Sequence, residues 1–174
     1  DVIRGKVTPS GKLSSTWPIK FSDTPYAEYY PGDYTTAVYN DDIYVGYRYY
    51  ETFGVDVMYE FGYGLSYTTF DYSNFKIKKI GNNYRLSVDV TNTGKVAGSE
   101  VVQFYVTKPD GKNEHPAKEL VGYGKTSVLA PNRKQTISIT VTSDELRTYS
   151  EEDTCWFIEK GEYKFYAAAS VKDI

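Results

Sequence analysis

The feature that most constrains the fold of this chain is an alternation of apolar and polar residues that recurs through residues 69–174. In residues 84–91 every second side chain is apolar, and the side chains between them are charged or carry a hydroxyl. Successive side chains of a β-strand point to opposite faces, so this period of two predicts a strand with one buried face and one solvated face. The same pattern recurs in residues 102–106, 136–142 and 163–169. We therefore expect each strand of this region to have one wet face.

Turn-forming residues separate the alternating segments at short intervals. Glycine, asparagine, aspartate and proline gather between the segments, and these residues favour turns through their φ preferences or local hydrogen bonds. The spacing predicts one short helical turn at 143–149 and strands at 71–80, 84–92, 100–107, 118–128, 134–142, 154–159 and 162–170. Seven short strands in about 105 residues are typical of a fibronectin type III-like or immunoglobulin-like β-sandwich, and the fold class is mainly β.

Residues 1–68 are not expected to fold as an independent domain. Their apolar pattern is short, and four prolines interrupt it. The sequence predicts a turn at 9–13 that enters a strand toward Trp17, and a strand or extended segment at 41–50. We expect this region to be the tail of a larger neighbouring domain, so that the chain divides into 1–68 and 69–174. Because the chain begins with Asp1 and not with Met, we expect that end to be a cut end.

Composition argues against two classes of partner. The net charge is −3 and the pI is about 5.3, and no cluster of Lys and Arg interleaves with the aromatic residues, so no nucleic acid partner is expected. No apolar run approaches the roughly 18 residues that a membrane span needs, so no membrane partner is expected. Residues 1–68 carry a net charge of −4 and residues 69–174 carry +1, which places the acidic excess in the tyrosine-rich part.

The segment 44–67 holds tyrosines and glycines at a density that an ordinary core or loop does not need. A tyrosine ring offers a flat apolar face and a terminal hydroxyl, which suits either a sugar or a neighbouring domain. The candidate site residues are Tyr47, Arg48, Tyr49 and Tyr50. They could form the rim of a substrate pocket, where the planar guanidinium would contact the substrate. An interface between domains is the favoured interpretation.

The carboxylates near the tyrosines are weaker candidates for catalysis. Glu51, Asp56 and Glu60 lie among aromatic residues, where desolvation could raise a pKa and create a general acid. Solvated acids, or partners for Arg48, are the preferred interpretation. Residues 151–153 are acidic as well, and we expect them to form a solvated loop.

The sequence predicts no metal site and no cofactor. His115 is the single histidine, so neither a histidine-based metal site nor a Ser-His-Asp triad can be assembled within this segment. We expect it to be exposed in a charged loop. Cys155 is the single cysteine, which excludes an intrachain disulfide, and we expect a buried thiol in a strand.

A set of motifs in consistent order resembles the family 3 glycoside hydrolases. In the first half they are TPSGKL at 8–13, YVGYRYY at 44–50 and YEFGYGLSYTTF at 59–70. In the second half they are VTNTG at 90–94, AGSEVVQFY at 97–105, PAKEL at 116–120, GEY at 161–163 and SVKD at 170–173. The second set is similar to the carboxyl-terminal fibronectin type III-like domain of that family. The resemblance covers nearly the whole chain.

This resemblance implies a retaining, exo-acting glycosidase, commonly a β-glucosidase or β-xylosidase, built from a TIM-like barrel, an α/β sandwich and this β-sandwich. Residues 1–68 would then be the tail of the α/β sandwich domain. An Asp nucleophile and a Glu acid/base would flank the glycosidic bond, with carboxyl groups ~5 to 5.5 Å apart. Neither maps onto a residue of this chain, so no catalytic residue is expected in it. The implied partners are the remainder of the same enzyme and a β-linked oligosaccharide or glycoside.

Two other functions fit the same residues. The aromatic surface suits a freestanding carbohydrate-binding or adhesive module, and residues 69–174 could be a purely structural spacer, since a sandwich fold does not specify function. The sequence leaves open the sugar, the linkage and whether the barrel precedes or follows this segment.

Overall fold

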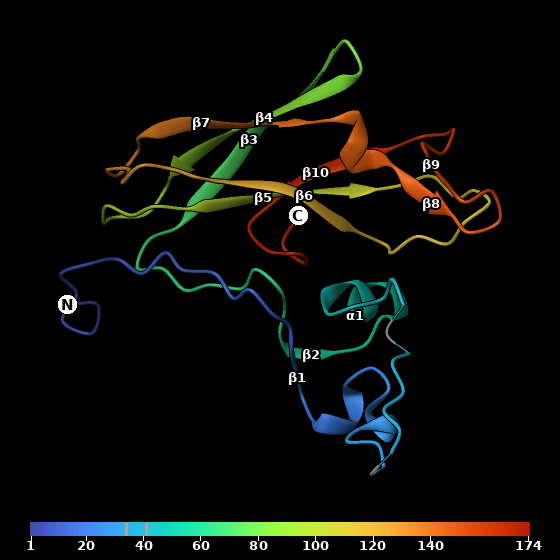
Figure 1. Cartoon of the computed structure of the whole chain (residues 1–174). Helices are drawn as coiled ribbons and strands as arrows, with labels where there is room; N and C mark the ends of the chain where they lie inside the picture. Colours follow the sequence, from blue (N-terminus) through green and yellow to red (C-terminus); the bar gives the residue numbers. More distant parts are fainter. Residues whose placement is uncertain (34, 41) are drawn as a thin grey trace.

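The computed structural model describes residues 1–33, 35–40 and 42–174. Two three-stranded antiparallel sheets pack face to face in the second part of the chain, and residues 1–68 lie below one of them (Figure 1). The first sheet has the order β3-β4-β7, formed by Phe70–Ile80, Asn83–Asn92 and Lys134–Val141. The second sheet has the order β10-β5-β6, formed by Lys164–Ala168, Val101–Thr107 and Glu119–Lys125.

The alternating sequence pattern identified the sandwich strands correctly. Six of the seven predicted strands correspond to these six strands, with ends that differ by a few residues. The expected mainly β fold with a fibronectin type III-like sandwich is confirmed.

The region between β7 and β10 differs from the prediction. The expected helical turn at 143–149 is a shorter 3-10 helix, η3 (Ser143–Leu146). The Glu145 carboxylate caps its amino-terminal end by accepting the Thr142 N–H at 2.6 Å. The next residues form β8 (Thr148–Ser150), which pairs with β9 (Cys155–Phe157). The predicted strand at 154–159 therefore lies in a separate two-stranded hairpin and not in either sandwich sheet.

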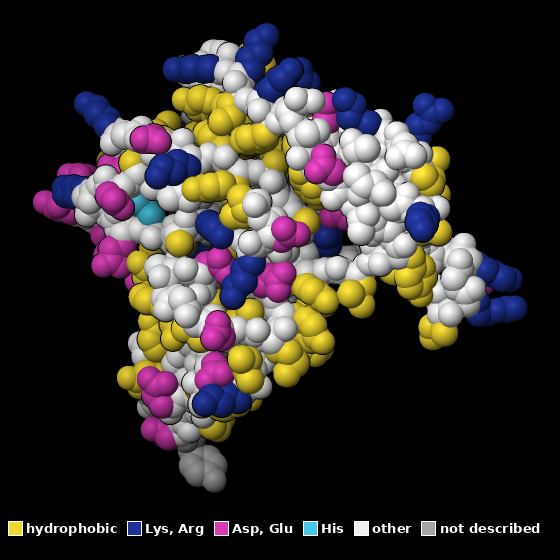
Figure 2. All heavy atoms as spheres, turned by 180° about the vertical axis from the view of Figure 1, so that it is seen from behind, with side chains coloured by type: hydrophobic (Ala, Val, Ile, Leu, Met, Phe, Trp, Pro, Cys, Tyr) yellow, Lys and Arg dark blue, Asp and Glu magenta, His cyan; other side chains and the backbone are white. Residues whose placement is uncertain are grey.

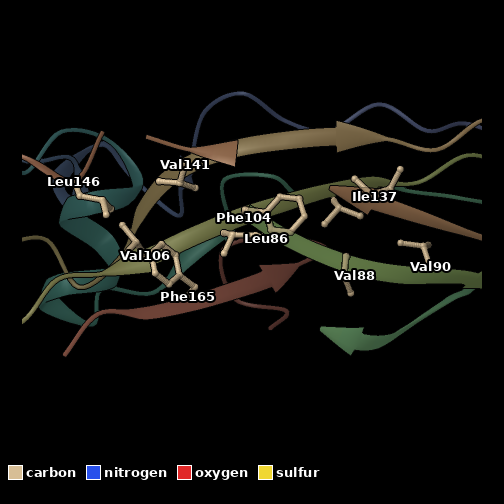
Figure 3. Packing of buried hydrophobic residues seen from close by; sticks show 10 residues of the cluster. Leu86, Val88, Val90, Phe104, Val106, Ile137, Val141, Leu146 and Phe165 are labelled. Carbon is tan, nitrogen blue, oxygen red and sulfur yellow. The ribbon is translucent and has the colours of Figure 1, made fainter. Parts of the chain in front are cut away.

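The hydrophobic core lies between the two sheets (Figure 3). Alternate residues of β4 and β5 supply most of it, as the period of two requires. The buried members are Leu86, Val88, Val90, Val102, Phe104, Val106, Ile137, Val141, Leu146 and Phe165. Burial of an aliphatic or aromatic side chain of this size contributes about 1.5–3 kcal/mol, so this core supports the sandwich without disulfides.

Strand β5 contradicts the expectation of one wet face per strand. Its five central residues, 102–106, are all buried. The outward-facing Gln103 and Tyr105 are covered because residues 1–68 pack on the outer face of this sheet (Figure 1). A sheet that is buried on both faces needs apolar or hydrogen-bonded side chains on both.

Residues 1–68 contain little regular structure. Their elements are β1 (Trp17–Pro18), η1 (Phe21–Asp23), η2 (Ala27–Tyr29), α1 (Tyr47–Phe53) and β2 (Val57–Tyr59). Strand β1 pairs with β2 near Trp17, where the sequence predicted a strand. Within the described part of this region Tyr50 is the one buried hydrophobic side chain. The described part of residues 1–68 therefore has no hydrophobic core of its own.

The expected extended segment at 41–50 is wrong for its last residues. Asp41 lies outside the described residues, whereas Tyr47 starts helix α1. Gly54 ends the helix with φ 64° and ψ 35°, and its N–H donates to the carbonyl of Tyr50. A glycine in this left-handed conformation is a common helix end. Tyrosine and valine favour strands, and their local preference concealed a helix that tertiary contacts stabilise.

No helix among the described residues is long and apolar enough to cross a lipid bilayer.

Candidate interdomain site

Helix α1 brings together two sequence motifs that are far apart in the chain. It lies beside the start of strand β6, below the outer face of the β10-β5-β6 sheet (Figure 1). Four of its side chains contact four consecutive residues of the sandwich: Tyr47 with Leu120, Arg48 with Glu119, Glu51 with Lys118, and Thr52 with Ala117. We call this set of contacts the α1–β6 seam.

The seam combines two hydrogen bonds and two ion pairs. The Tyr47 hydroxyl accepts the backbone N–H of Leu120 at 2.7 Å, and the Thr52 hydroxyl accepts the N–H of Ala117 at 2.9 Å. The Lys118 Nζ lies 3.1 Å from the Glu51 carboxylate. The helix positions i, i+1, i+4 and i+5 share one face, which is why these side chains can follow an extended segment in antiparallel order.

Arg48 belongs to a chain of charges that ends inside the sandwich. Its Nη2 lies 3.6 Å from Glu119 Oε2, and the other oxygen of Glu119 lies 3.1 Å from Lys108 Nζ. The Lys108 side chain is 6% exposed and also donates to the carbonyl of Arg147 at 3.0 Å. A charge this buried is costly unless it is paired, so the Glu119 carboxylate is needed to neutralise Lys108 as well as to hold Arg48.

The Tyr47 ring fastens the helix to the covered face of β5. It stacks on Phe61 with a centroid distance of 4.7 Å and meets Tyr105 edge to face at 6.1 Å. The Tyr105 hydroxyl donates to Gln103 Oε1 at 2.7 Å, and burial raises the pKa of Tyr105, which stays a neutral donor. Tyr47 is therefore part of the packing between residues 1–68 and the sandwich.

Gln103 links three separate segments of the chain. Its Nε2 donates to the carbonyls of Gly62 at 3.2 Å and Ala169 at 2.8 Å. Gly62 has φ 81°, and a Cβ atom there would contact the Gln103 carboxamide, so this position needs glycine for both its conformation and its space.

Tyr49 and Tyr50 make their aromatic contacts away from the seam. Tyr49 packs against Tyr50 at 5.4 Å and Phe53 at 5.1 Å between ring centroids. Tyr50 is 4% exposed, and burial raises its pKa. It borders a groove of about 470 Å³ with Thr24, Pro25 and other residues of the first region. The structure thus places the four predicted residues on helix α1. Tyr47 and Arg48 contact the sandwich, Tyr49 packs against Phe53 of the same helix, and Tyr50 borders the groove.

A second contact, the ion pair between Lys12 and Glu100, holds the first residues of the chain on the sandwich. Lys12 Nζ lies 2.8 Å from Glu100 Oε1, and this carboxylate is 8% exposed. The Tyr72 hydroxyl donates to the same oxygen at 3.1 Å. Burial, followed by the charge of Glu100, raises the pKa of Tyr72, so its hydroxyl remains protonated. This buried ion pair was not identified from the sequence.

The other predicted carboxylates have separate partners or are exposed. Glu51 is held by Lys118, and Glu60 accepts the Ser170 hydroxyl at 2.9 Å. Asp56 is exposed. The acidic loop at 151–153 is exposed as predicted, and Lys112 pairs with it.

Two single residues differ from their predicted environments. His115 is half-buried, not exposed, and burial followed by the charge of Lys108 lowers its pKa. Cys155 is exposed, not buried, because β9 pairs only with β8 and lies outside the sandwich. Among the described residues no group of three or more His, Cys, Asp or Glu side chains is arranged to hold a metal ion.

The first region presents an open apolar groove of about 540 Å³. Several of its lining residues are aromatic or aliphatic and partly exposed, including Trp17 at 51%, Tyr59 at 38% and Leu65 at 68%. Figure 2 shows hydrophobic side chains spread over this lower part of the molecule. Exposed apolar surfaces of this kind are typical of sites that contact a protein, a membrane or a ligand.

Comparisons with known proteins agree with this architecture. Residues 100–171 match the fibronectin type III-like domain family. The β-glucosidase BoGH3A of Bacteroides ovatus is 41% identical over 182 aligned residues, which cover 100% of this chain and 24% of the relative. An exo-α-(1→6)-L-arabinopyranosidase of Bifidobacterium longum is 38% identical and is covered to 23%.

A solved structure gives the same result. The family 3 β-glucosidase of Bifidobacterium adolescentis superposes with a TM-score of 0.94 at 37% identity, over 99% of this chain and 26% of that chain. The chain therefore spans about a quarter of the length of the relatives it matches. Over nearly its whole length it is similar to one segment of family 3 β-glucosidases, and within that segment residues 100–171 match the fibronectin type III-like domain.

Proposed function

We propose that this chain is the non-catalytic part of a retaining, exo-acting β-glycosidase, in which the sandwich holds residues 1–68 in place against the catalytic domains. The observation that carries the proposal is the pairing of a well-anchored helix with an uncovered apolar groove in the same region. The match to about a quarter of each β-glucosidase relative supports it.

In this proposal residues 1–68 are the tail of the α/β sandwich domain with its linker, and residues 69–174 are the fibronectin type III-like domain. The near absence of buried hydrophobic residues in the described part of the first region supports this division. Its groove, with Trp17 and Tyr59, would be covered by the rest of the α/β domain.

The four candidate residues would serve the interface and not the chemistry. Tyr47 and Arg48 hold the helix on the sandwich, whereas Tyr49 packs against Phe53 within the helix and Tyr50 borders a groove of the first region. The reaction would take place on a β-linked oligosaccharide or glycoside, between carboxylates of the other domains. The pairing of Glu51 with Lys118 favours this assignment, because it leaves that carboxylate a structural role.

The choice of sugar would also lie outside this chain. Relatives named as a β-glucosidase and as an arabinopyranosidase match it almost equally well. A segment shared so evenly by enzymes with different sugar names is a poor candidate for the specificity pocket.

The direct test is an activity assay on the purified chain. Aryl β-glucosides and aryl β-xylosides should not be hydrolysed above the rate of a buffer blank. Robust turnover by the chain alone would overturn the assignment. The gene sequence around this segment should also encode a barrel with its aspartate, on one side or the other.

The alternative of a freestanding sugar-binding module draws on the exposed aromatic residues. Affinity electrophoresis in neutral soluble polysaccharides separates the two functions, with Tyr49→Ala as the informative variant and Tyr123→Ala, a 70% exposed tyrosine of β6, as its control. Retardation that Tyr49→Ala alone abolishes would favour the module.

A further inference from the structure

The β3–β4 hairpin is a projecting, strongly cationic element in an otherwise acidic protein. Residues 76–85 contain Lys76, Lys78, Lys79 and Arg85 and no acidic residue, although the whole chain has a net charge of −3. All four cations are exposed, and none forms an ion pair with a described residue. The hairpin extends beyond the sandwich in Figure 1, and Figure 2 shows Lys and Arg side chains gathered at the same end.

Strand register places three of these cations on one face. Lys78 lies directly opposite Arg85, and Lys76 lies opposite Ser87, so Lys76, Lys78 and Arg85 share the outer face of the sheet. Like charges directly opposite each other destabilise a strand pair. Lysines on β3 could be explained as protection of an edge strand. That reason does not apply to Arg85, because β4 is the central strand of its sheet.

Hydroxyl groups extend the same face. Thr140 pairs with Arg85 and Ser138 pairs with Ser87 across β4 and β7, so the three hydroxyl residues lie beside the cations. The acids of this face lie farther along the strands. The Asp89 carboxylate already accepts hydrogen bonds from Thr136 at 2.6 Å and Asn74 at 3.0 Å, and it forms an ion pair with Lys134 at 3.0 Å. Asp71 is at the far end of β3, opposite Thr91.

We propose that this face binds an anionic polysaccharide, with the carboxylates of uronic acid residues held by Lys76, Lys78 and Arg85 and sugar hydroxyls held by Ser87, Ser138 and Thr140. A strand face with unpaired cations and hydroxyl neighbours matches an extended chain that carries a carboxylate on its sugar rings. Arginine is suited to bidentate carboxylate recognition.

The same surface fits other polyanions less well. Membrane association needs several apolar side chains beside the cations, and this face has one, Ile80, at 47% exposure. Binding of single-stranded nucleic acid without sequence readout uses aromatic side chains for base stacking. Tyr84 is directed to the core side of the sheet, where its ring packs near Phe165 at 5.7 Å. The proposal does not depend on the glycosidase assignment.

The test is affinity electrophoresis of the 174-residue chain in gels that contain polygalacturonate, with hydroxyethylcellulose as the neutral polymer. We expect retardation by polygalacturonate at low salt, none by the neutral polymer, and loss of the effect as ionic strength rises. The double variant Lys78→Ala/Arg85→Ala should bind roughly thirtyfold more weakly, since each cation near an anionic surface contributes about a factor of five.

A matched control removes the same charge elsewhere. Lys79 belongs to the opposite face of the hairpin and Lys160 is exposed in a distant turn, so Lys79→Ala/Lys160→Ala should weaken binding less than about threefold through long-range screening alone. Equal losses in the two double variants would overturn the proposed face, as would the absence of retardation. Binding to phosphatidylserine vesicles without binding to polygalacturonate would identify a membrane partner and contradict the proposal.

Thermal unfolding of the double variant separates a loss of ligand binding from a loss of folding. Removal of the opposed like charges should leave the unfolding temperature of Lys78→Ala/Arg85→Ala unchanged or higher. A strong decrease would show that the two cations are structural, which would count against a ligand site.

Discussion

Residues 1–68 and 69–174 contain similar kinds of apolar residue but use them in opposite ways. In the sandwich the alternate residues of each strand meet between two sheets, where Phe104 and Leu86 are fully buried. In the first region large side chains such as Tyr39, at 88% exposure, and Phe21, at 61%, remain open to solvent. The comparison indicates that the sandwich carries its own stability, whereas the first region is held by the α1–β6 seam and, in our proposal, by the remainder of the enzyme.

The largest effect that tests this comparison is a change in the sandwich core. Phe104→Ala should lower the free energy of unfolding by about 3–5 kcal/mol, because it removes buried contacts and leaves a cavity between the sheets. Urea denaturation followed by circular dichroism measures it. A loss below about 1 kcal/mol would mean that the core is not where the stability lies.

The next effect concerns the charges of the seam. Glu119→Ala should destabilise the chain by about 3 kcal/mol, because the buried Lys108 loses its carboxylate and Arg48 loses its anchor. Glu162→Ala is the matched control, since this residue is exposed in a turn before β10. Similar unfolding midpoints in urea for the two variants would indicate that the seam does not hold the first region.

A smaller effect is expected from a single hydroxyl. Tyr47→Phe keeps the ring packed on Phe61 but leaves the N–H of Leu120 without its acceptor, at a cost of about 1–2 kcal/mol. Hydrogen exchange at Leu120 should accelerate in this variant. The amide of Tyr123, farther along β6, provides the reference, and equal changes at both amides would argue against a local role for the hydroxyl.

Part of the loss of stability at acidic pH should come from Asp89 of the sandwich. Hydrogen bonds from Thr136 and Asn74, followed by Lys134, hold the pKa of Asp89 well below its usual range. The folded state therefore binds the proton more weakly than the unfolded state, and the contribution of Asp89 is present above about pH 4 and is lost as the pH falls. Asp89→Asn should flatten the decline in unfolding temperature between neutral and acidic pH. An unchanged slope would contradict this role.

The smallest effect is expected in the open groove of the first region. Trp17→Ala should change the stability of this chain by less than about 0.5 kcal/mol, because the side chain is half exposed and lies outside the core. A loss comparable to that of Phe104→Ala would show that the first region has a core of its own.

The sequence predicted the sandwich well because the pattern that specifies each of its strands lies within the strand itself. A period of two and turn residues between strands define β4 and β7 without knowledge of what packs on them. The predictions failed where distant contacts decide the structure. Helix α1 is built from strand-favouring tyrosines, and its stability comes from residues 117–120 and from the Gly54 cap.

The candidate site was only partly visible for the same reason. Tyr47 and Arg48 stood out in the sequence, whereas Thr52, Lys118 and Glu119 did not, although the last two belong to a recognised motif. The charge order offered a signal, since Arg48 and Glu51 meet Glu119 and Lys118 in antiparallel order. That complementarity becomes evident only when the two segments are known to be neighbours.

Native-state hydrogen exchange on the whole 174-residue chain is the sharpest test of whether residues 1–68 lack a stable core apart from the sandwich. We expect the amides of β4 and β5 to be protected up to the global free energy of unfolding, those of α1 to an intermediate level, and those of residues 14–33 and 35–40 only weakly. Protection of these last residues to the same level as β5 would contradict this expectation.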